Sequence, residues 1–345
     1  MATKKSMGKK KKQAALPKND QVIAPEVIAE NQKTPVFTAP ERHKVPESMT
    51  KKDTIMVVLY SLLMFVAMTV QTGRMSIVLI VLALVLCIGK KPLENMRAHL
   101  SLPMLGLIAF ALMSGFASLH SRFGSVAAAE LNKVMAAFSL AVILLARFEK
   151  KHVRGLLFGF AGVSAVIALI CVDMGGQAKL FGAFNSYVQL LGGDFSGVLA
   201  NSQDGRVDGI YNDANLTGAL LGMAILVSSY LAHTAKKLTG RFFALVTLGI
   251  SAVSFIVAMS RGAIAVFAVA VLVYLAAEGK DTRIKLFLLL LTAGTVSAAA
   301  GAVALVNISQ DSSIPVLVAL FSGLVAFALD WAITARLGLI LQRHK

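Results

Sequence analysis

The chain has 345 residues, of which 57% are hydrophobic and only 15% are charged. Soluble domains typically carry about 25% charged residues and about 45–50% apolar ones. Together with a mean hydropathy of +0.73, this composition excludes a soluble globular enzyme, and it excludes a disordered chain even more firmly. The net charge is +16. Such a charge suggests nucleic-acid binding in a soluble protein but cytoplasmic loops in a membrane protein, so the positions of the charges must decide.

The first 52 residues differ in composition from the rest of the chain. They contain 12 of the 34 basic residues, five acidic residues and five of the eight prolines, and they show no helical or strand periodicity. We therefore predict that residues 1–52 form a disordered basic cytoplasmic tail, solvated or resting on anionic lipid. No apolar segment follows the basic run closely enough for a signal peptide. Phe37 is the only aromatic residue in this stretch, so stacking on nucleic-acid bases is not expected and we predict no nucleic-acid partner.

From residue 53 onward, apolar runs alternate with short polar or basic stretches. A transmembrane helix needs about 20 apolar residues, with a range of about 17–25. The second run is short, so we expect it either to form a tight hairpin with the first run or to tilt and use its flanks. The sequence predicts an all-α fold, a polytopic transmembrane helix bundle of about ten spans over residues 53–345. The ten runs are 55–71, 75–89, 101–119, 126–146, 155–174, 217–234, 242–259, 262–277, 286–306 and 315–335.

The basic residues between the runs predict the orientation of the bundle. With the tail in the cytoplasm, the inner loops 90–99, 147–154, 235–241 and 278–285 hold 3 + 4 + 3 + 3 = 13 basic residues. The outer loops hold only five, namely Arg74, Arg122, Lys179, Arg206 and Arg261. This bias follows the positive-inside rule, so we predict a multi-pass protein with a cytoplasmic N-terminus.

One predicted outer loop, residues 175–216, is much longer than the others. Long loops without structure of their own are usually functional or disordered. The loop begins with an amphipathic apolar piece around residues 180–191, which could lie along the outer interface. It ends in a polar stretch, residues 201–215, that leads directly into the sixth run.

Two outer arginines are candidates for binding an anion. Arg206 lies in the long loop, and Arg261 lies between two apolar runs with almost no loop around it. Guanidinium groups bind phosphate in a bidentate manner and stay charged, so the pair could converge on a lipid phosphate or pyrophosphate. A lone outer arginine is also commonly a snorkelling anchor. Asn212, Asp213 and Asn215 precede the sixth run, where any of them could cap the helix.

These residues carry a resemblance to a known family. The stretch from Arg206 to Asn215, RVDGIYNDAN, resembles the R-x-x-G-x-[FY]-x-[ND]-x-N element of the O-antigen ligase and O-antigen polymerase superfamily, and Ser260-Arg261-Gly262 resembles its S-R-G element. The order of the two motifs, their predicted position on the outer side and the number of spans before each motif agree with the family pattern. The resemblance covers roughly residues 55–306 and is weak in the first spans.

The resemblance implies a membrane glycosyltransferase in the cytoplasmic (inner) membrane of a bacterium. Members transfer a glycan from undecaprenyl pyrophosphate to a glycan, lipid or protein acceptor on the outer face, with neither metal nor cofactor. Arg206 and Arg261 would be the catalytic and substrate-binding residues that stabilise the pyrophosphate leaving group. Asn215 would position Arg206 or the glycan, or would only cap the helix.

The chain also departs from the family pattern. The family has a second large outer loop with a histidine that acts as the base, whereas the loop 307–314 is short and contains no histidine. We therefore expect either that the chain is the front part of a longer protein, with the base beyond Lys345, or that its acceptor chemistry differs.

Two other classes of function remain open on the sequence. A transporter or flippase for a lipid-linked sugar or a small solute would favour inverted repeats and matching broken spans, and the sequence has no such pairing. A non-catalytic scaffold that recruits partners through the basic tail leaves the long outer loop unexplained. Asp330, deep in the last run, is either a buried functional acid or a helix-end residue that reaches the inner interface. Neither histidine nor cysteine spacing matches a metal-binding motif.

Overall fold

The computed structural model describes residues 49–345 except 71, 99–101, 123, 177, 194–206, 212, 309–312 and 344–345. The predicted tail lies outside the described residues up to position 48. Residues 46–345 form one compact unit, and its described residues form helices without any strand. The all-helical fold class is therefore confirmed.

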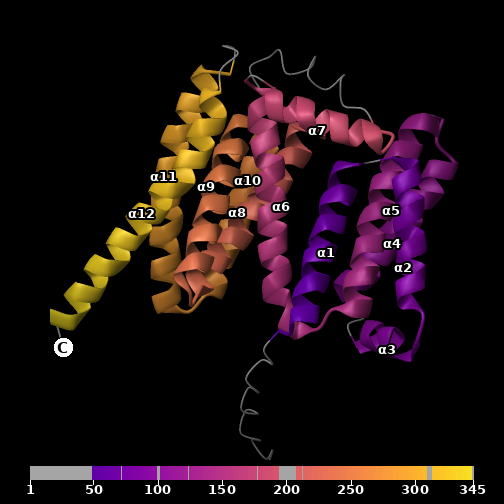
Figure 1. Ribbon diagram of the computed structural model, residues 1–345, viewed down its shortest axis with the longest axis horizontal. Coiled ribbons are helices and arrows are strands. Elements are labelled where there is room, and N and C mark those ends of the chain that lie inside the picture. Colours follow the sequence, from indigo (N-terminus) through magenta and orange to yellow (C-terminus); the bar gives the residue numbers. More distant parts are fainter. Residues whose placement is uncertain are drawn as a thin grey trace, which may run out of the picture. The chain divides into compact units, whose positions relative to one another are not determined.

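The helices follow one another with short connections, except across residues 191–213 (Figure 1). Their bounds are α1 (Lys51–Thr69), α2 (Gly73–Cys87), α3 (Lys90–Ala98), α4 (Leu102–Leu119), α5 (Gly124–Arg147), the 3₁₀ turn η1 (Lys150–His152), α6 (Val153–Met174), α7 (Lys179–Leu190), α8 (Ala214–Thr234), α9 (Leu238–Val257), α10 (Arg261–Ala277), α11 (Lys280–Val306) and α12 (Ile314–Arg343).

Each of the ten predicted apolar runs coincides with one of these helices. Among the described residues, six helices are long and apolar enough to cross a membrane: α1, α6 with η1, α8, α9, α11 and α12. A seventh would be the pair α2 and α3, which is bent by 102° at the break between its helices. A multi-pass membrane protein fits these helices. The predicted number of about ten spans is not confirmed, because α10 has only 17 residues and α2 only 15, and because α4 and α5 are not among the helices that qualify.

The first helix begins slightly earlier than the sequence predicts. Lys51 and Lys52, which we assigned to the tail, belong to α1. The reason is a capping box, in which the Thr50 hydroxyl accepts from the Asp53 backbone N–H and the Asp53 carboxylate accepts from the Thr50 backbone N–H. This exchange satisfies two of the groups that a helix start leaves unpaired.

Helix α9 lies at the centre of the C-terminal helices and packs against α6, α8, α11 and α12. Its contact with α12 depends on two glycines. A Cβ atom placed on Gly249 would lie 2.5 Å from the Cα atom of Gly323, so the backbones touch where any side chain would separate them. Small residues at such crossings are typical of helix packing in membranes, where dispersion contacts replace the hydrophobic driving force.

The N-terminal helices are connected to this group through α1 and α6, which pack on each other. Helix α5 packs against α2, α3 and α4. Helix α7 is the predicted amphipathic piece, and it crosses the ends of its neighbours (Figure 1). It buries Phe181, Phe184 and Val188 in the same apolar cluster as residues of α6.

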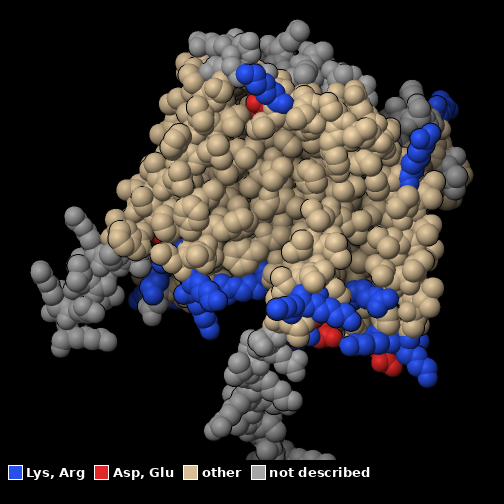
Figure 2. All heavy atoms as spheres, viewed as in Figure 1, with Lys and Arg blue, Asp and Glu red and all other residues tan. Residues whose placement is uncertain are grey.

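Lys and Arg side chains gather at one end of the helices, and few lie at the other (Figure 2). The first group includes the residues of the four predicted inner loops; we call this side the basic end. The side that carries α7 and the starts of α8 and α10 is the opposite end.

Near the basic end, Asp330 of α12 is buried, with its Oδ2 atom 2.7 Å from Nε of Arg241 and its Oδ1 atom 2.9 Å from Nη2. Asp330 therefore joins α12 to α9 through a two-point ion pair.

Candidate functional site

The two sequence motifs meet at the opposite end, where α8 and α10 begin side by side. Ser260, immediately before α10, donates a hydrogen bond from its hydroxyl to Oδ1 of Asn215 in the first turn of α8, at 2.7 Å. The same hydroxyl accepts from the backbone N–H of Ala263 at 3.1 Å and so caps α10. A single buried hydroxyl thus fixes one helix start and ties it to the other.

The sequence left two roles open for Asn215, to position another group or to cap α8, and the capping geometry of α8 decides between them. Asp213 is the N-cap, because its carboxylate accepts from the backbone N–H groups of Asn215 at 2.7 Å and Leu216 at 3.3 Å. The Asn215 side chain is exposed and does not cap the helix; its carbonyl oxygen is held by Ser260. The Asn215 amide nitrogen belongs to the same side-chain group, so the hydrogen bond to Ser260 restricts its direction as well.

Close approach of the two helix starts depends on glycines at the contact. A Cβ atom on Gly218 would lie 2.5 Å from Cβ of Ala263, and one on Gly262 would lie 3.3 Å from Oδ1 of Asn215. A side chain at Gly218 would push the two helices apart, whereas one at Gly262 would press on the Asn215 oxygen that Ser260 holds. The glycine of the S-R-G element therefore has a steric reason in this fold.

Arg261 is the first residue of α10, and it is exposed. Within the part of the chain that the structure describes, it forms no ion pair with an acidic side chain. The start of a helix presents unpaired backbone N–H groups and the positive end of the helix dipole. Arg261 therefore adds a full positive charge to a position that already favours an anion.

The segment Val207–Tyr211 is anchored between α6 and α8. Val207 and Ile210 are buried in the cluster that also takes the apolar face of α7. Gly209 has a φ of +72°, which favours glycine, and the Thr217 hydroxyl donates to the Asp208 carbonyl at 2.6 Å. Burial raises the pKa of Tyr211, so its phenol stays protonated.

Arg206 lies outside the described residues. The expected convergence of Arg206 and Arg261 on one anion therefore stays a prediction. The structure nevertheless gives the position of the adjacent residue, because Val207 is fully buried beside α6.

An apolar groove runs along α8 and α10, beginning at the motif residues. It has a volume of about 400 Å³. Asn215 and Gly262 line it in the first turns of the two helices, and all its other lining residues are apolar or glycine. They are Gly218, Ala219, Gly222, Met223, Leu226, Ala263, Val266, Phe267 and Ala270. Arg261 does not line the groove but directly precedes the lining residue Gly262 in the chain. The arrangement combines an apolar body with a polar end beside a helix start that favours an anion, which suits an amphiphile with an anionic head.

A residue that we did not single out in the sequence fixes α7 at the opposite end of the bundle. Asp173, at the end of α6, is buried, and its Oδ2 atom accepts from the backbone N–H of Phe181 at 2.9 Å. This hydrogen bond satisfies a backbone donor in the first turn of α7 and fixes α7 to α6. An acidic residue at the end of an apolar run is a usable signal, but its partner eight residues away is not visible in the sequence.

In the described part of the chain, three or more His, Cys, Asp or Glu residues nowhere gather so that they could hold a metal ion. No family model, curated protein or solved structure matches the chain. The resemblance to the O-antigen ligase superfamily therefore depends on the two sequence motifs alone.

Proposed function

We propose that the protein is a membrane glycosyltransferase of the O-antigen ligase type. It transfers a glycan from undecaprenyl pyrophosphate to a glycan, lipid or protein acceptor on the outer face of the bacterial cytoplasmic membrane. The observation that supports this proposal is the hydrogen bond of Ser260 to Asn215, which lines one end of an apolar groove, with Arg261 directly before the lining residue Gly262 in the chain. The lipid carrier has matching chemistry, an anionic pyrophosphate joined to a polyprenyl chain.

In this proposal all ten apolar helices are spans. The basic end faces the cytoplasm, in agreement with the positive-inside rule, and the opposite end with α7 faces outward. The groove between α8 and α10 then begins at the outer boundary of the membrane and runs toward its centre. A polyprenyl chain lies in the groove with its pyrophosphate at the start of α10.

The chemical contribution of this site is the stabilisation of the leaving group. When the glycosidic bond to the pyrophosphate breaks, negative charge develops on the departing oxygen. Arg261 and the N–H groups at the start of α10 are fixed near that charge before the reaction, so they stabilise it without rearrangement. Arg206 acts as the second cation on the same pyrophosphate. Asn215, held by Ser260, positions the glycan or Arg206.

The test is glycan transfer in membranes that contain the full-length protein. Labelled glycan on undecaprenyl pyrophosphate is supplied, and transfer to the acceptor is measured for Arg261→Gln, Arg206→Gln and the control Arg74→Gln. Arg74 is an exposed arginine at the start of α2 that does not line the groove. Removing one charge-stabilising donor typically lowers kcat by about 10²–10³, so we expect that loss for Arg261 and Arg206 and less than about a threefold change for Arg74.

Two results would contradict the proposal. Equal transfer by the wild type and both site variants would remove the catalytic role of the arginines. Movement of the intact lipid-linked glycan across the membrane, without transfer to an acceptor, would identify a flippase instead.

A further inference from the structure

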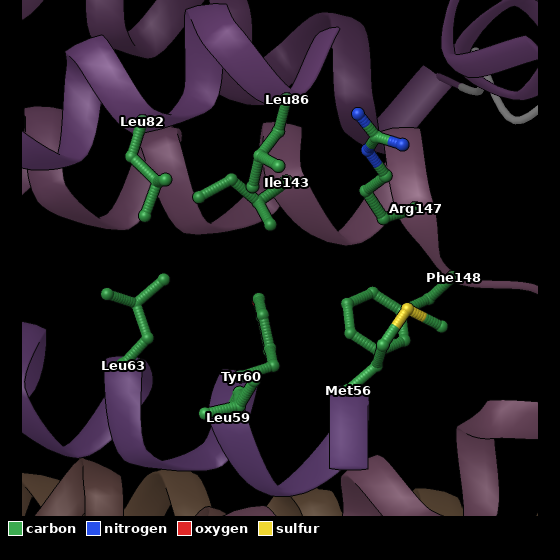
Figure 3. Close-up of a pocket in the computed structure, with 9 residues that line it drawn as sticks. All are labelled: Met56, Leu59, Tyr60, Leu63, Leu82, Leu86, Ile143, Arg147 and Phe148. Carbon is green, nitrogen blue, oxygen red and sulfur yellow. The ribbon is translucent and has the colours of Figure 1, made fainter. Parts of the chain in front are cut away.

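A second apolar cavity lies on the other side of the bundle, near the basic end. Its volume is about 430 Å³, within the usual range for small-molecule sites. Helix α1 forms one wall and α2 with α5 forms the other (Figure 3). The lining residues are Met56, Leu59, Tyr60, Leu63, Leu82, Leu86, Ile143, Arg147 and Phe148.

The cavity exists because α1 packs mainly on α6 and touches α2 and α5 closely along only part of its length. Toward the opposite end, Ala67 of α1 joins Leu79 and Leu140 in a packed cluster. In the middle of the cavity lining, the Tyr60 hydroxyl donates to the Leu140 carbonyl at 2.9 Å and so joins α1 to α5. The rings of Tyr60 and Phe148 meet edge to face, with centroids 5.0 Å apart.

The cavity opens sideways at the surface of the helix bundle, along α1. Leu59 lines it and is 59% exposed, and its neighbours Ile55 and Leu62 on α1 are similarly exposed. Water does not fill a space lined by leucine, isoleucine and phenylalanine side chains. In a membrane the surrounding hydrocarbon is the available occupant, and the opening lets an acyl chain enter from the side.

One charged residue lines this cavity. Arg147, the last residue of α5, lies at the end of the cavity where Met56 and Phe148 are found (Figure 3). Its side chain is exposed, and it forms no ion pair within the described ranges of the chain. The cavity therefore combines an apolar body with a cation at one end.

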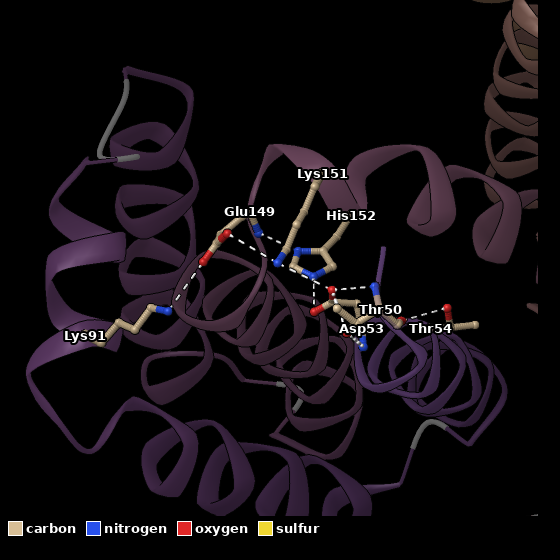
Figure 4. A network of polar contacts seen from close by, with 7 residues as sticks. All are labelled: Thr50, Asp53, Thr54, Lys91, Glu149, Lys151 and His152. Carbon is tan, nitrogen blue, oxygen red and sulfur yellow. Dashed lines mark hydrogen bonds and ion pairs between the residues drawn. The ribbon is translucent and has the colours of Figure 1, made fainter. Parts of the chain in front are cut away.

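The nearby carboxylates are already paired with other cations (Figure 4). Glu149 lies 3.6 Å from the Lys91 ammonium and 3.9 Å from that of Lys151. Asp53 accepts from the ring of buried His152 at 3.1 Å and lies 3.4 Å from Lys151. In these contacts neither Glu149 nor Asp53 pairs with Arg147, which is therefore accessible to an anion from outside the chain. The nearest source at the basic end is the phosphate layer of the membrane.

We propose that this cavity binds one acyl chain of an anionic phospholipid, whose phosphate is held by Arg147. The guanidinium fork binds phosphate in a bidentate manner, and the surplus of basic residues at this end favours a lipid with a net negative charge. The site is separate from the proposed glycan-transfer site, because no residue is shared between the two sets of lining residues.

The test uses native mass spectrometry of the full-length protein in neutral detergent, titrated with phosphatidylglycerol or with phosphatidylcholine of the same acyl chains. The variants are Arg147→Gln and the matched control Lys150→Gln, an exposed cation three residues away that does not line the cavity. General attraction to the basic end depends on both cations about equally, whereas a bound phosphate depends on Arg147. We expect phosphatidylglycerol affinity to fall about tenfold more in Arg147→Gln than in Lys150→Gln.

A third variant tests the cavity itself. Leu82→Phe adds bulk to the wall while it keeps the charge unchanged, so it should also lower phosphatidylglycerol affinity about tenfold. Circular dichroism of each variant distinguishes loss of binding from loss of fold. Equal affinities for the two glutamine variants, equal affinities of the wild type for the two lipids, or full binding by folded Leu82→Phe would each overturn the proposal.

Discussion

The hydrogen bond between Ser260 and Asn215 joins the two motifs, and a double-mutant cycle measures its strength. Ser260 makes two bonds, the cap to Ala263 and the bond to Asn215, whereas the Asn215 side chain accepts the bond from Ser260. Losing a helix cap costs about 1 kcal/mol. Losing a hydrogen bond also costs about 1 kcal/mol, within the range of up to about 1.7 kcal/mol measured between membrane helices.

We therefore expect Ser260→Ala to lower the free energy of unfolding by about 2 kcal/mol and Asn215→Ala by about 1 kcal/mol. The double variant should lose about 2 kcal/mol rather than the sum of about 3, because the shared bond can be lost only once. The assay is unfolding of the full-length protein by dodecyl sulfate in mixed micelles, followed by circular dichroism.

The control cycle combines Ser260→Ala with Thr72→Ala. Thr72 caps α2 through its bond to the Met75 backbone N–H and shares no partner with Ser260. These two losses should add within about 0.5 kcal/mol. Additive losses in the cycle of Ser260 and Asn215 would refute the inference that this bond connects the motifs.

Two further predictions concern the packing of the C-terminal helices in the same unfolding assay. Gly249→Ala should destabilise the fold by about 1–3 kcal/mol, because its Cβ atom would overlap the backbone of α12. The control Gly294→Ala, whose Cβ atom would meet nothing within 4 Å, should be neutral or stabilising. Similar losses of stability in both variants would contradict the close crossing of α9 and α12. Asp330→Asn should cost about 3 kcal/mol by leaving Arg241 without its charged partner. Adding Arg241→Gln should then recover part of that loss, whereas simple addition of the two losses would show that the pair is not coupled.

Much of the fold follows from one-dimensional patterns in the sequence. Hydropathy predicts every apolar helix, because a helix in a membrane must satisfy its own backbone groups and present apolar side chains to lipid. The ends of the helices are less predictable. Asn212, Asp213 and Asn215 are equally good caps by sequence, and only the backbone geometry assigns the cap to Asp213 and frees the Asn215 side chain for Ser260.

The candidate site was only partly predictable for the same reason. The motif spacing indicates that Asn215 and Arg261 belong to neighbouring helix starts, but the apolar groove beneath them depends on how α8 and α10 cross. The ion pair of Asp330 with Arg241 joins residues 89 positions apart, and no periodicity links such a pair. Our two interpretations of Asp330 from the sequence therefore missed its actual partner.

The sequence by itself determined the helical class and the basic bias between the apolar runs, because both depend on composition along the chain and on the cost of burying charge in lipid. The tertiary structure alone decided which polar groups meet and where apolar walls stay apart. Arg147 and Leu82 are ordinary residues in the sequence, yet the divergence of α1 from α2 and α5 places both on one cavity. Packing between distant segments creates such cavities, since they form where the shapes of two helices fail to fill the space between them.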